Sequence, residues 1–388
     1  MAAAVVLTMF VVPLALAAAV VDVATGALRR SGSRLPRVRL LGFGICWAWL
    51  ETAGVLRAGL LWLSGRAGDV DAHFRLQRWW ADRLMQCLRA TCGVEVDVDG
   101  VEALRPGGFV LLVRHASLAD SLLTAWVVTE NAGLRPRVVL KRELLADPCL
   151  DIVGHRLPNC FVDRDAADSG PELAAIAEMA HGLGDDDVAI IFPEGTRASA
   201  AKRTRALERI AEGDPARAAR LAGLHHLIPP RPAGSRALIE GSGGAEVVLG
   251  WHTGFDGLDD FRGILTALAR PRTPVHIHFE RVGHIPTDPS EFAEWLDAAW
   301  QQMDRSVCVE VHGRLEIHER VDDHEQVADV DAAAGDVADL GDRAGDRRAH
   351  RVLHLHRLDD DERLVLDDDV TDGDVHRDDR AGQRGDRS

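Results

Sequence analysis

Paired cysteines, lysine and an excess of positive charge are all missing or scarce in this sequence. The six cysteines lack the short paired spacings of zinc sites, so they indicate free thiols of a reducing compartment or small core residues. Lysine occurs at Lys141 and Lys202 alone. The formal net charge of −16 gives no support to nucleic-acid binding, and we expect no nucleic acid among the partners.

Charged side chains are also absent from residues 1–21, until Asp22 ends the apolar run. About 20 apolar residues are enough to cross the hydrocarbon core of a bilayer. A cleaved signal peptide is the alternative, because residues 15–19 include small side chains. However, no Lys or Arg precedes the apolar run, which argues against a signal peptide. We therefore predict a retained membrane element.

A cluster of arginines follows this run, at Arg29, Arg30, Arg34, Arg37 and Arg39. Such a loop is expected to stay on the cytoplasmic side, where it either contacts anionic headgroups or is a solvated linker. Residues 40–65 are apolar again but contain Glu51 and Arg57, each of which costs about 2.5–3.5 kcal/mol at mid-bilayer. We predict that residues 1–66 form a monotopic or hairpin membrane anchor rather than two independent spans, with the active site on the cytoplasmic face.

Three later apolar runs each stop at polar residues able to do chemistry. Residues 109–113 precede Arg114 and His115, residues 160–162 precede Asp163 and Arg164, and residues 188–192 precede a Pro-Glu-Gly-Thr-Arg segment. Apolar runs of this length are typical of buried, parallel strands. Since ligands gather at the carboxyl ends of such strands, the polar residues are expected to converge on one edge of a sheet.

The remaining pattern completes an α/β fold with a mixed, largely parallel sheet flanked by helices, over residues 67–305. Further strands are expected at 94–98, 138–140, 247–251 and 275–279, and helices at 71–91, 118–129, 203–221 and 289–304. The strand at 94–98 alternates apolar and charged residues, which predicts a sheet edge. The membrane-associated helical hairpin of residues 1–66 precedes this domain.

His115 and Asp120 are the candidate catalytic pair. A neutral imidazole accepts a proton near physiological pH, and a nearby carboxylate fixes its tautomer. Five residues turn a helix by about 500°, so the pair can meet only if His115 lies in a turn and Asp120 in the first helical turn. The alternative is structural, because Ser117 and Asp120 also fit a capping box at a helix start. No Gly-x-Ser-x-Gly turn provides an acyl-enzyme nucleophile, which favours direct attack by a substrate hydroxyl.

These motifs resemble those of the glycerolipid acyltransferase family, which includes 1-acylglycerol-3-phosphate acyltransferases. The resemblance rests on His-x4-Asp at 115–120, Phe-Val-Asp-Arg at 161–164 and Phe-Pro-Glu-Gly-Thr-Arg at 192–197. A fourth segment, at 223–232, is similar to the His-x-Leu-x-Pro-Arg element of the lysophospholipid and lysocardiolipin acyltransferase branch. The resemblance covers roughly residues 70–305, and the order and spacing of several motifs make it specific.

The resemblance implies roles for individual residues. His115 and Asp120 match the catalytic pair, and Arg164 matches the arginine that binds the acceptor's phosphate. Glu194, Gly195 and Arg197 fall in the motif for acceptor binding and site organisation. Two departures from the family pattern are Pro158-Asn159, where a glycine is usual, and Pro-Arg-Pro at 230–232, where Pro-Arg-Thr is usual.

The residues themselves add further expectations. Gly195 permits backbone angles closed to other residues, and Thr196 is expected to cap the following helix. Amides at that helix start, together with Arg197, favour an anion. Lys141 is expected either to face an anionic substrate or to be a solvated strand end, and Arg231 to line the acyl or headgroup channel. No metal is expected, since His225 and His226 lack partner ligands at metal spacing.

The sequence thus predicts a membrane-bound O-acyltransferase of phospholipid biosynthesis or remodelling. It would move a fatty acyl group from acyl-CoA or acyl carrier protein, a co-substrate rather than a cofactor, to a lysophospholipid hydroxyl. Lysophosphatidate is the default acceptor, while the fourth segment favours larger headgroups. The alternatives are a thioesterase, another hydrolase such as a phosphatase, and an inactive lipid-binding module.

The C-terminal segment, residues 306–388, differs from the rest. Residues 321–388 hold 21 acidic and 10 basic residues, and residues 301–388 contain no Phe, Trp or Tyr. Many charges with few apolar anchors predict a disordered tail, or an aberrant one from a shifted reading frame.

Overall fold

One sheet of seven strands organises the part of the chain that the structure describes. A computed structural model describes residues 2–28, 34–117, 119–163, 169–258, 260–270 and 274–335. The chain divides into two compact units, Met1–Glu325 and Gln326–Ser388. Of the second unit, residues 326–335 are described, as the end of a helix.

The sheet is mixed and largely parallel, as predicted. Its strand order is β1-β7-β6-β2-β5-β3-β4, and each neighbouring pair is parallel except the antiparallel pair β6–β7. Because the central strands run in one direction, their carboxyl ends share one edge. The strand bounds are β1 Val96–Asp99, β2 Phe109–Val113, β3 Arg135–Lys141, β4 Cys160–Val162, β5 Asp187–Ile191, β6 Val247–Thr253 and β7 Val275–Val282.

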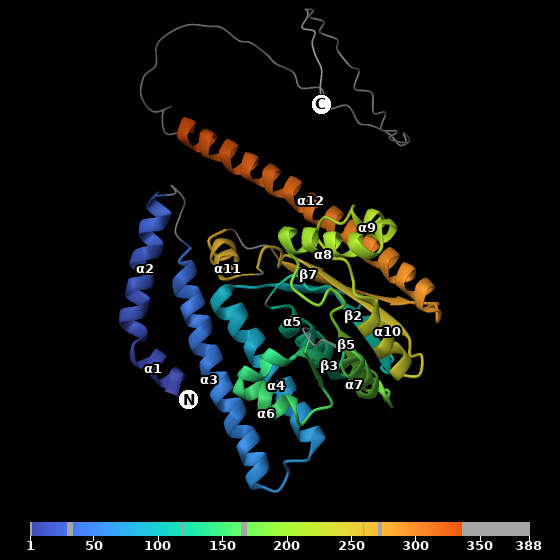
Figure 1. Cartoon of the computed structure of the whole chain (residues 1–388). Coiled ribbons are helices and arrows are strands. Elements are labelled where there is room, and N and C mark those ends of the chain that lie inside the picture. Colours follow the sequence, from blue (N-terminus) through green and yellow to red (C-terminus); the bar gives the residue numbers. More distant parts are fainter. Residues whose placement is uncertain are drawn as a thin grey trace, which may run out of the picture. The chain divides into compact units, whose positions relative to one another are not determined.

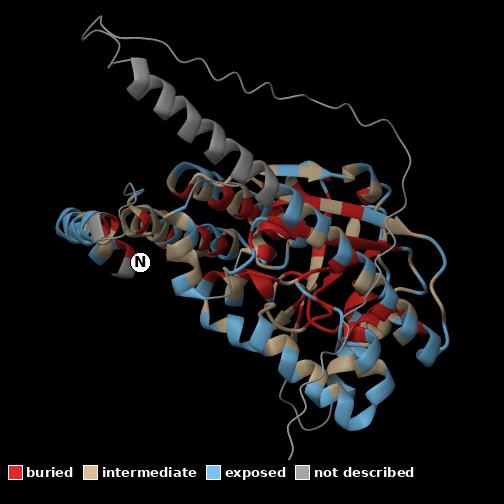
Figure 2. Ribbon diagram, turned by 90° about the horizontal axis from the view of Figure 1, so that it is seen from above, coloured by how far each residue is buried: buried red, intermediate tan, exposed pale blue. Residues whose placement is uncertain are grey.

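Helices cover both faces of the sheet, because successive side chains of a strand point to opposite faces. In β2, Phe109 and Leu111 face a core that includes helices α4 (Val70–Cys92) and α5 (Asp120–Trp126). Val110 and Leu112 face α7 (Gly170–Ala180), α10 (Pro232–Gly241) and α12 (Pro289–Gly335). All five β2 side chains are buried, and Figures 1 and 2 show the three layers and their buried interior.

Several shorter helices connect these layers. The helix expected at 203–221 is two helices, since Pro215 cannot donate its backbone nitrogen to continue the first. Asp214 accepts a hydrogen bond from the Arg217 amide at 2.9 Å and so caps the second helix. These elements are α6 Pro148–Gly154, α8 Ala200–Gly213, α9 Pro215–Leu221, α11 Phe261–Leu268, and the single turns η1 Val101–Leu104, η2 Val127–Asn131 and η3 Arg142–Ala146.

The N-terminal residues form a helical hairpin of α1 (Ala2–Met9), α2 (Val11–Leu28) and α3 (Pro36–Leu63). Asp22 is buried and accepts hydrogen bonds from the Arg37 amide at 2.9 Å and from its guanidinium at 2.8 Å, which fixes α2 against α3. Arg37 is therefore paired within the protein. No helix among the described residues combines the length and the apolarity needed to cross a membrane.

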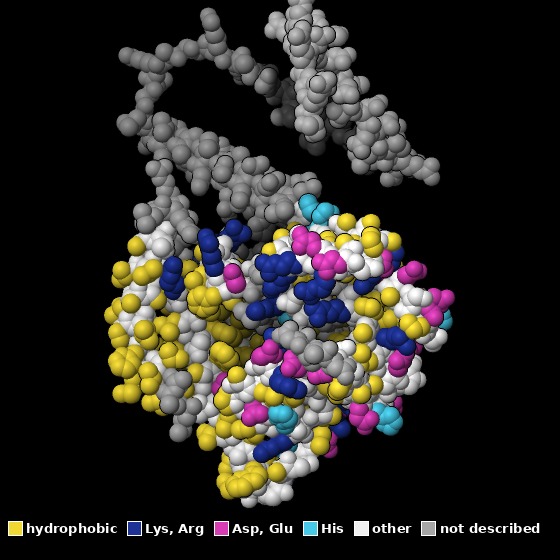
Figure 3. All heavy atoms as spheres, in the orientation of Figure 1, with side chains coloured by type: hydrophobic (Ala, Val, Ile, Leu, Met, Phe, Trp, Pro, Cys, Tyr) yellow, Lys and Arg dark blue, Asp and Glu magenta, His cyan; other side chains and the backbone are white. Residues whose placement is uncertain are grey.

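Two charged residues of α3, Glu51 and Arg57, contact tryptophans of α4. Glu51 accepts a hydrogen bond from the Trp80 indole of α4 at 3.0 Å, and the Arg57 guanidinium lies 3.5 Å from the centre of the Trp79 ring. Apolar side chains cover much of the remaining hairpin surface (Figure 3). Those exposed by more than 60% on α2 and α3 are Val12, Leu16, Val20, Leu60, Trp62 and Leu63.

The last helix, α12, continues past the boundary expected at residue 305 and reaches Gly335. Val307 is fully buried in the core together with Trp300 and Met303, so residues just beyond the expected boundary belong to the folded domain. The expectation that disorder begins at residue 306 is therefore wrong, because α12 still has a sheet face to pack against there. The rest of the predicted tail, residues 336–388, lies outside the described residues.

Candidate active site

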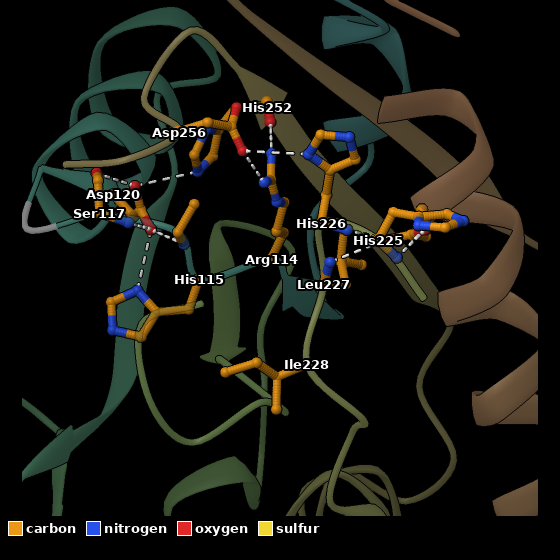
Figure 4. Close-up of polar contacts among 12 residues, drawn as sticks. Arg114, His115, Ser117, Asp120, His225, His226, Leu227, Ile228, His252 and Asp256 are labelled. Atoms are coloured by element: carbon orange, nitrogen blue, oxygen red, sulfur yellow. Dashed lines mark hydrogen bonds and ion pairs between the residues drawn. The ribbon is translucent and has the colours of Figure 1, made fainter. Parts of the chain in front are cut away.

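The loop between β2 and α5 brings His115 onto Asp120. His115 lies in the loop and Asp120 is the first residue of α5, so the helix geometry that would separate them does not apply. Nδ1 of His115 lies 3.0 Å from Oδ2 of Asp120 (Figure 4). The same oxygen accepts the backbone amide of Ser117 at 2.8 Å. The helix-start contact and the histidine contact therefore coexist, since one carboxylate makes both.

Asp120 is fully buried and remains ionised. Burial alone would raise the pKa of this carboxyl group, but the charge of His252 and the hydrogen bond to His115 hold the pKa well below its usual range. Ser117 also donates its hydroxyl to Oδ1. A stable negative charge beside Nδ1 favours the tautomer in which Nδ1 carries the proton, and this leaves Nε2 of His115 as the basic nitrogen.

Glu194 holds two distant loops against each other. Its Oε1 accepts the backbone amide of His115 at 2.9 Å, and its Oε2 accepts the amide of Ile228 at 3.1 Å. The side chain is 1% exposed, so the carboxyl group points into the protein. Both carboxylate oxygens of Glu194 are therefore occupied by backbone amides.

Burial raises the pKa of Glu194 to about 8, although the two amide donors and Arg114 favour the ionised form. The folded state therefore binds this proton more tightly than the unfolded chain, whose ordinary value is 4.5. Stability from Glu194 is fully present below that value and is lost as pH rises toward 8, by at most ~1.4 kcal/mol per pH unit.

We expect Glu194→Gln to remove this part of the pH dependence. Urea unfolding of both proteins at intervals from pH 5 to pH 8 measures it, and the difference between them isolates Glu194 from other titrating groups. Parallel curves for the two proteins would contradict the expectation.

A further ion pair joins the buried Arg114 to the partly exposed Asp256, behind the loop between β2 and α5 that we term the catalytic loop. Arg114 is fully buried, and its guanidinium donates hydrogen bonds to the backbone carbonyl of His252 and to the carboxylate of Asp256. Burial opposes ionisation of Asp256, but His226 and Arg114 hold its pKa well below its usual range. Nδ1 of His226 lies 3.8 Å from this carboxylate. The end of β2 is thereby tied to the loop after β6.

Asp304 of α12 fixes the fourth motif. Its carboxylate accepts the backbone amides of His225, His226 and Leu227 at 2.8, 2.7 and 2.8 Å. Asp304 is 2% exposed, and three amide donors compensate the burial of its charge. The two histidines are therefore positioned through their backbone, and the side chain of His226 lies near Asp256 (Figure 4).

The turn after β5 packs Gly195 against Arg231. Gly195 has φ 68°, and a Cβ there would lie 3.3 Å from Nε of Arg231, so both angle and space favour glycine. Helix α8 begins at Ala200 with Ser199 at its N-cap position, so the expectation that Thr196 caps this helix is wrong. The intervening residues instead reach across to the catalytic loop, where the Ala198 amide donates to the His115 carbonyl at 2.7 Å.

The other predicted binding residues differ in how close they lie to His115. Arg197 directly precedes Ala198 and is thus brought beside the His115 loop. Lys141 lies at the end of β3 with its side chain 41% exposed, and its Nζ is 2.7 Å from Glu143. This favours the expectation of a solvated strand end. Arg164 lies outside the described residues.

A cleft of about 290 Å³ opens beside the catalytic loop. Lys and Arg side chains gather on the face of the molecule drawn in Figure 3. The cleft is lined by Ala116, Ala198, Ser199, Ala200, Arg203, His225, His226, Asp256 and Gly257.

Three of the residues that build this site, His252, Asp256 and Asp304, were not expected from the sequence. His252 could have been predicted, because it directly follows the apolar run 247–251, just as polar residues follow the apolar run before His115. Arg114 was adjacent to the motif, but nothing indicated its partner. Asp256 and Asp304 lie among ordinary polar residues and become identifiable only through their tertiary contacts.

Part of the chain matches a known protein family. Residues 95–227 match the family model described as Acyltransferase, a segment that contains β1 to β5 and both His115 and Asp120. No curated protein matches the sequence at a significant level. Among solved structures, one that is similar is the crystal structure of the 1-acyl-sn-glycerophosphate (LPA) acyltransferase PlsC from Thermotoga maritima. That match has 16% sequence identity and a TM-score of 0.47, and it covers 70% of this chain and 97% of that chain.

Proposed function

We propose that the chain belongs to the glycerolipid acyltransferase family, since residues 95–227 match the Acyltransferase family model. We further propose that the protein transfers a fatty acyl group to the hydroxyl of a lysophospholipid. The proposed donor is acyl-CoA or acyl carrier protein, and the proposed acceptor is 1-acylglycerol-3-phosphate. The observation that carries the proposal is the 3.0 Å contact of His115 with Asp120 at the carboxyl end of β2, inside the matched segment.

The chemistry follows from that contact. Nε2 of His115 takes the proton of the acceptor hydroxyl as its oxygen attacks the thioester carbonyl carbon. A C–O bond forms, the C–S bond breaks, and the thiolate leaves and takes the proton back from His115. Asp120 stabilises the imidazolium between these two steps through its ionised carboxylate. This scheme uses no cofactor other than the donor itself.

We assign substrate binding to the basic residues around the same edge. Arg197 and Arg231 lie on the two loops that Gly195 brings together, and guanidinium groups suit a phosphate through their fork of donors. Arg164 follows the neighbouring strand β4 in the sequence. In this assignment Glu194 and Thr196 shape the turn that presents Arg197.

Acyl transfer is tested with the purified full chain, labelled acyl-CoA or acyl carrier protein, and lysolipids that differ in headgroup. The expected product is a diacyl phospholipid, formed fastest from lysophosphatidate. Free fatty acid as the sole product would replace the proposal by a thioesterase. Release of phosphate from lysophosphatidate would indicate a phosphatase, and lipid binding without turnover would indicate an inactive module.

The hairpin α1–α3 is proposed to hold the enzyme at the membrane surface, with the active site on the cytoplasmic face. Large exposed apolar patches on a protein mark interaction sites, and a lipid acceptor makes the bilayer the natural partner. The support is the exposed apolar side chains of α2 and α3, together with the contacts of Glu51 and Arg57 with tryptophans of α4. The arginine-rich connection between the helices favours the cytoplasmic side.

We expect the double change Leu16→Glu and Val20→Glu to weaken binding to phospholipid vesicles by about tenfold or more, since burying one such side chain stabilises by ~1.5–3 kcal/mol. Val309→Glu is the matched control, because Val309 is 74% exposed but belongs to α12 instead of the hairpin. Vesicle co-sedimentation measures the effect. Equal binding by both variants would exclude the hairpin as the contact surface.

A further inference from the structure

A second histidine contacts the catalytic carboxylate from the opposite side. His252 is the sixth residue of β6 and is fully buried. Its Nε2 lies 3.1 Å from Oδ1 of Asp120, while His115 contacts Oδ2 (Figure 4). Asp120 is thus placed between two imidazole rings that come from strand ends 137 residues apart in the sequence.

A packing role does not account for this histidine. Neither of its ring nitrogens makes a hydrogen bond of regular geometry with the described residues. A buried polar group without a partner is destabilising, and an apolar side chain would pack at least as well beside Phe255, whose ring lies 5.8 Å from that of His252. Unlike an apolar side chain, histidine at this position interacts electrostatically with Asp120.

The other charged groups around His252 are already paired. Arg114, from the end of β2, donates to the His252 backbone carbonyl and to Asp256. Asp256, in the loop after β6, is neutralised by Arg114 and also faces His226. Glu194, from the loop after β5, feels the charge of Asp120 but bonds two backbone amides. Asp120 is therefore the carboxylate whose charge responds most directly to His252.

We propose that His252 is a positioning residue that withdraws negative charge from Asp120 and thereby lets His115 release its proton at a lower pH. This inference rests on the proposed function, in which His115 must be neutral to act as the base. A cationic His252, or a neutral one that carries its proton on Nε2, weakens the hold of Asp120 on a protonated His115. Both forms act in the same direction, because each adds positive potential at the carboxylate.

The proposal predicts a shift in the pH profile. Without His252, Asp120 binds the imidazolium of His115 more strongly, so the base becomes available only at higher pH. We expect the acid limb of kcat/KM to move upward by about one pH unit in His252→Gln and by more in His252→Phe. The amide of glutamine retains an N–H for Oδ1, whereas phenylalanine retains none. His278→Gln, on β7 and in contact with Asp99 and Glu310, is the matched control and should keep the wild-type profile.

A second readout does not depend on acyl transfer. Diethyl pyrocarbonate modifies neutral imidazole, so the pH dependence of His115 modification, followed by peptide mass spectrometry, reports its protonation in each protein. The same upward shift is expected there. His252→Asn is a third variant with a smaller side chain. Because the three side chains differ in size, a shift common to all of them is not caused by one packing defect.

The outcomes separate the two proposals. If the wild type transfers no acyl group yet the modification profile shifts in the variants, the proposed function fails while the role of His252 stands. If the wild type is active and both profiles stay within about 0.2 pH units of it in folded variants, the role of His252 is wrong. Activity loss at all pH values without a shift would also overturn it, since that is the result of a structural defect alone.

Discussion

Replacing His115 with alanine is expected to reduce acyl transfer by about 10²–10⁴-fold, the usual contribution of a general base. The reason is geometric. In His115, Nδ1 is held by the buried carboxylate of Asp120, and this leaves Nε2 as the basic nitrogen. Its side chain is 16% exposed, so Nε2 has access to a substrate while Nδ1 is held at Asp120.

The measurement is initial-rate transfer from labelled acyl donor to lysophosphatidate, with thermal unfolding as a check that the variant is folded. His276→Ala is a suitable control because it removes a histidine from the domain at β7, in contact with Asp97 and away from the catalytic loop. Retention of more than about a tenth of wild-type kcat in folded His115→Ala would show that another group takes the proton.

Asp120→Asn is expected to lower kcat by a similar factor and to destabilise the loop as well. The neutral amide cannot stabilise the imidazolium, and its NH2 group meets the amide donors of Ala116 and Ser117 where an acceptor oxygen is required. Because Asp120 is fully buried, it contacts no substrate, so KM should change much less than kcat.

The stability effect of Asp120 has its own pH signature. A carboxyl group whose folded pKa is held below its ordinary value stabilises the protein above that value and loses the contribution on acidification. Denaturant unfolding should therefore show a gap between wild type and Asp120→Asn at pH 7 that narrows toward pH 3. A rise in KM that accounts for the whole loss of kcat/KM would instead place Asp120 in substrate binding.

Local pattern was sufficient for the strands and for the catalytic motif. Each apolar run that ended at a polar residue became a strand close to its predicted bounds, because a buried parallel strand requires uninterrupted apolar side chains on both faces. The contact of His115 with Asp120 followed from a spacing of five residues and one helix start. The same reasoning overlooked His252, although its strand ended in the same way.

Boundaries that depend on tertiary packing were predicted less well. Thr196 was expected to cap a helix that begins only at Ala200, because the Ala198 amide bonds the His115 carbonyl and holds the intervening residues extended across to it. The domain was expected to end at residue 305, yet Val307 is buried against the sheet. Composition alone gave no indication that α12 still had a packing surface there.

What the sequence determined by itself is the α/β fold, the strand positions and the identity of the proposed base with its carboxylate, since all of these depend on residues within a few positions of one another. What only the tertiary structure decided is the environment of that pair. Glu194 joins His115 to Ile228, Asp304 fixes His225, and His252 reaches Asp120 from another strand. These partners lie 34 or more residues apart in the sequence, and their charges take effect only where burial lowers the local dielectric and brings them within about 3 Å.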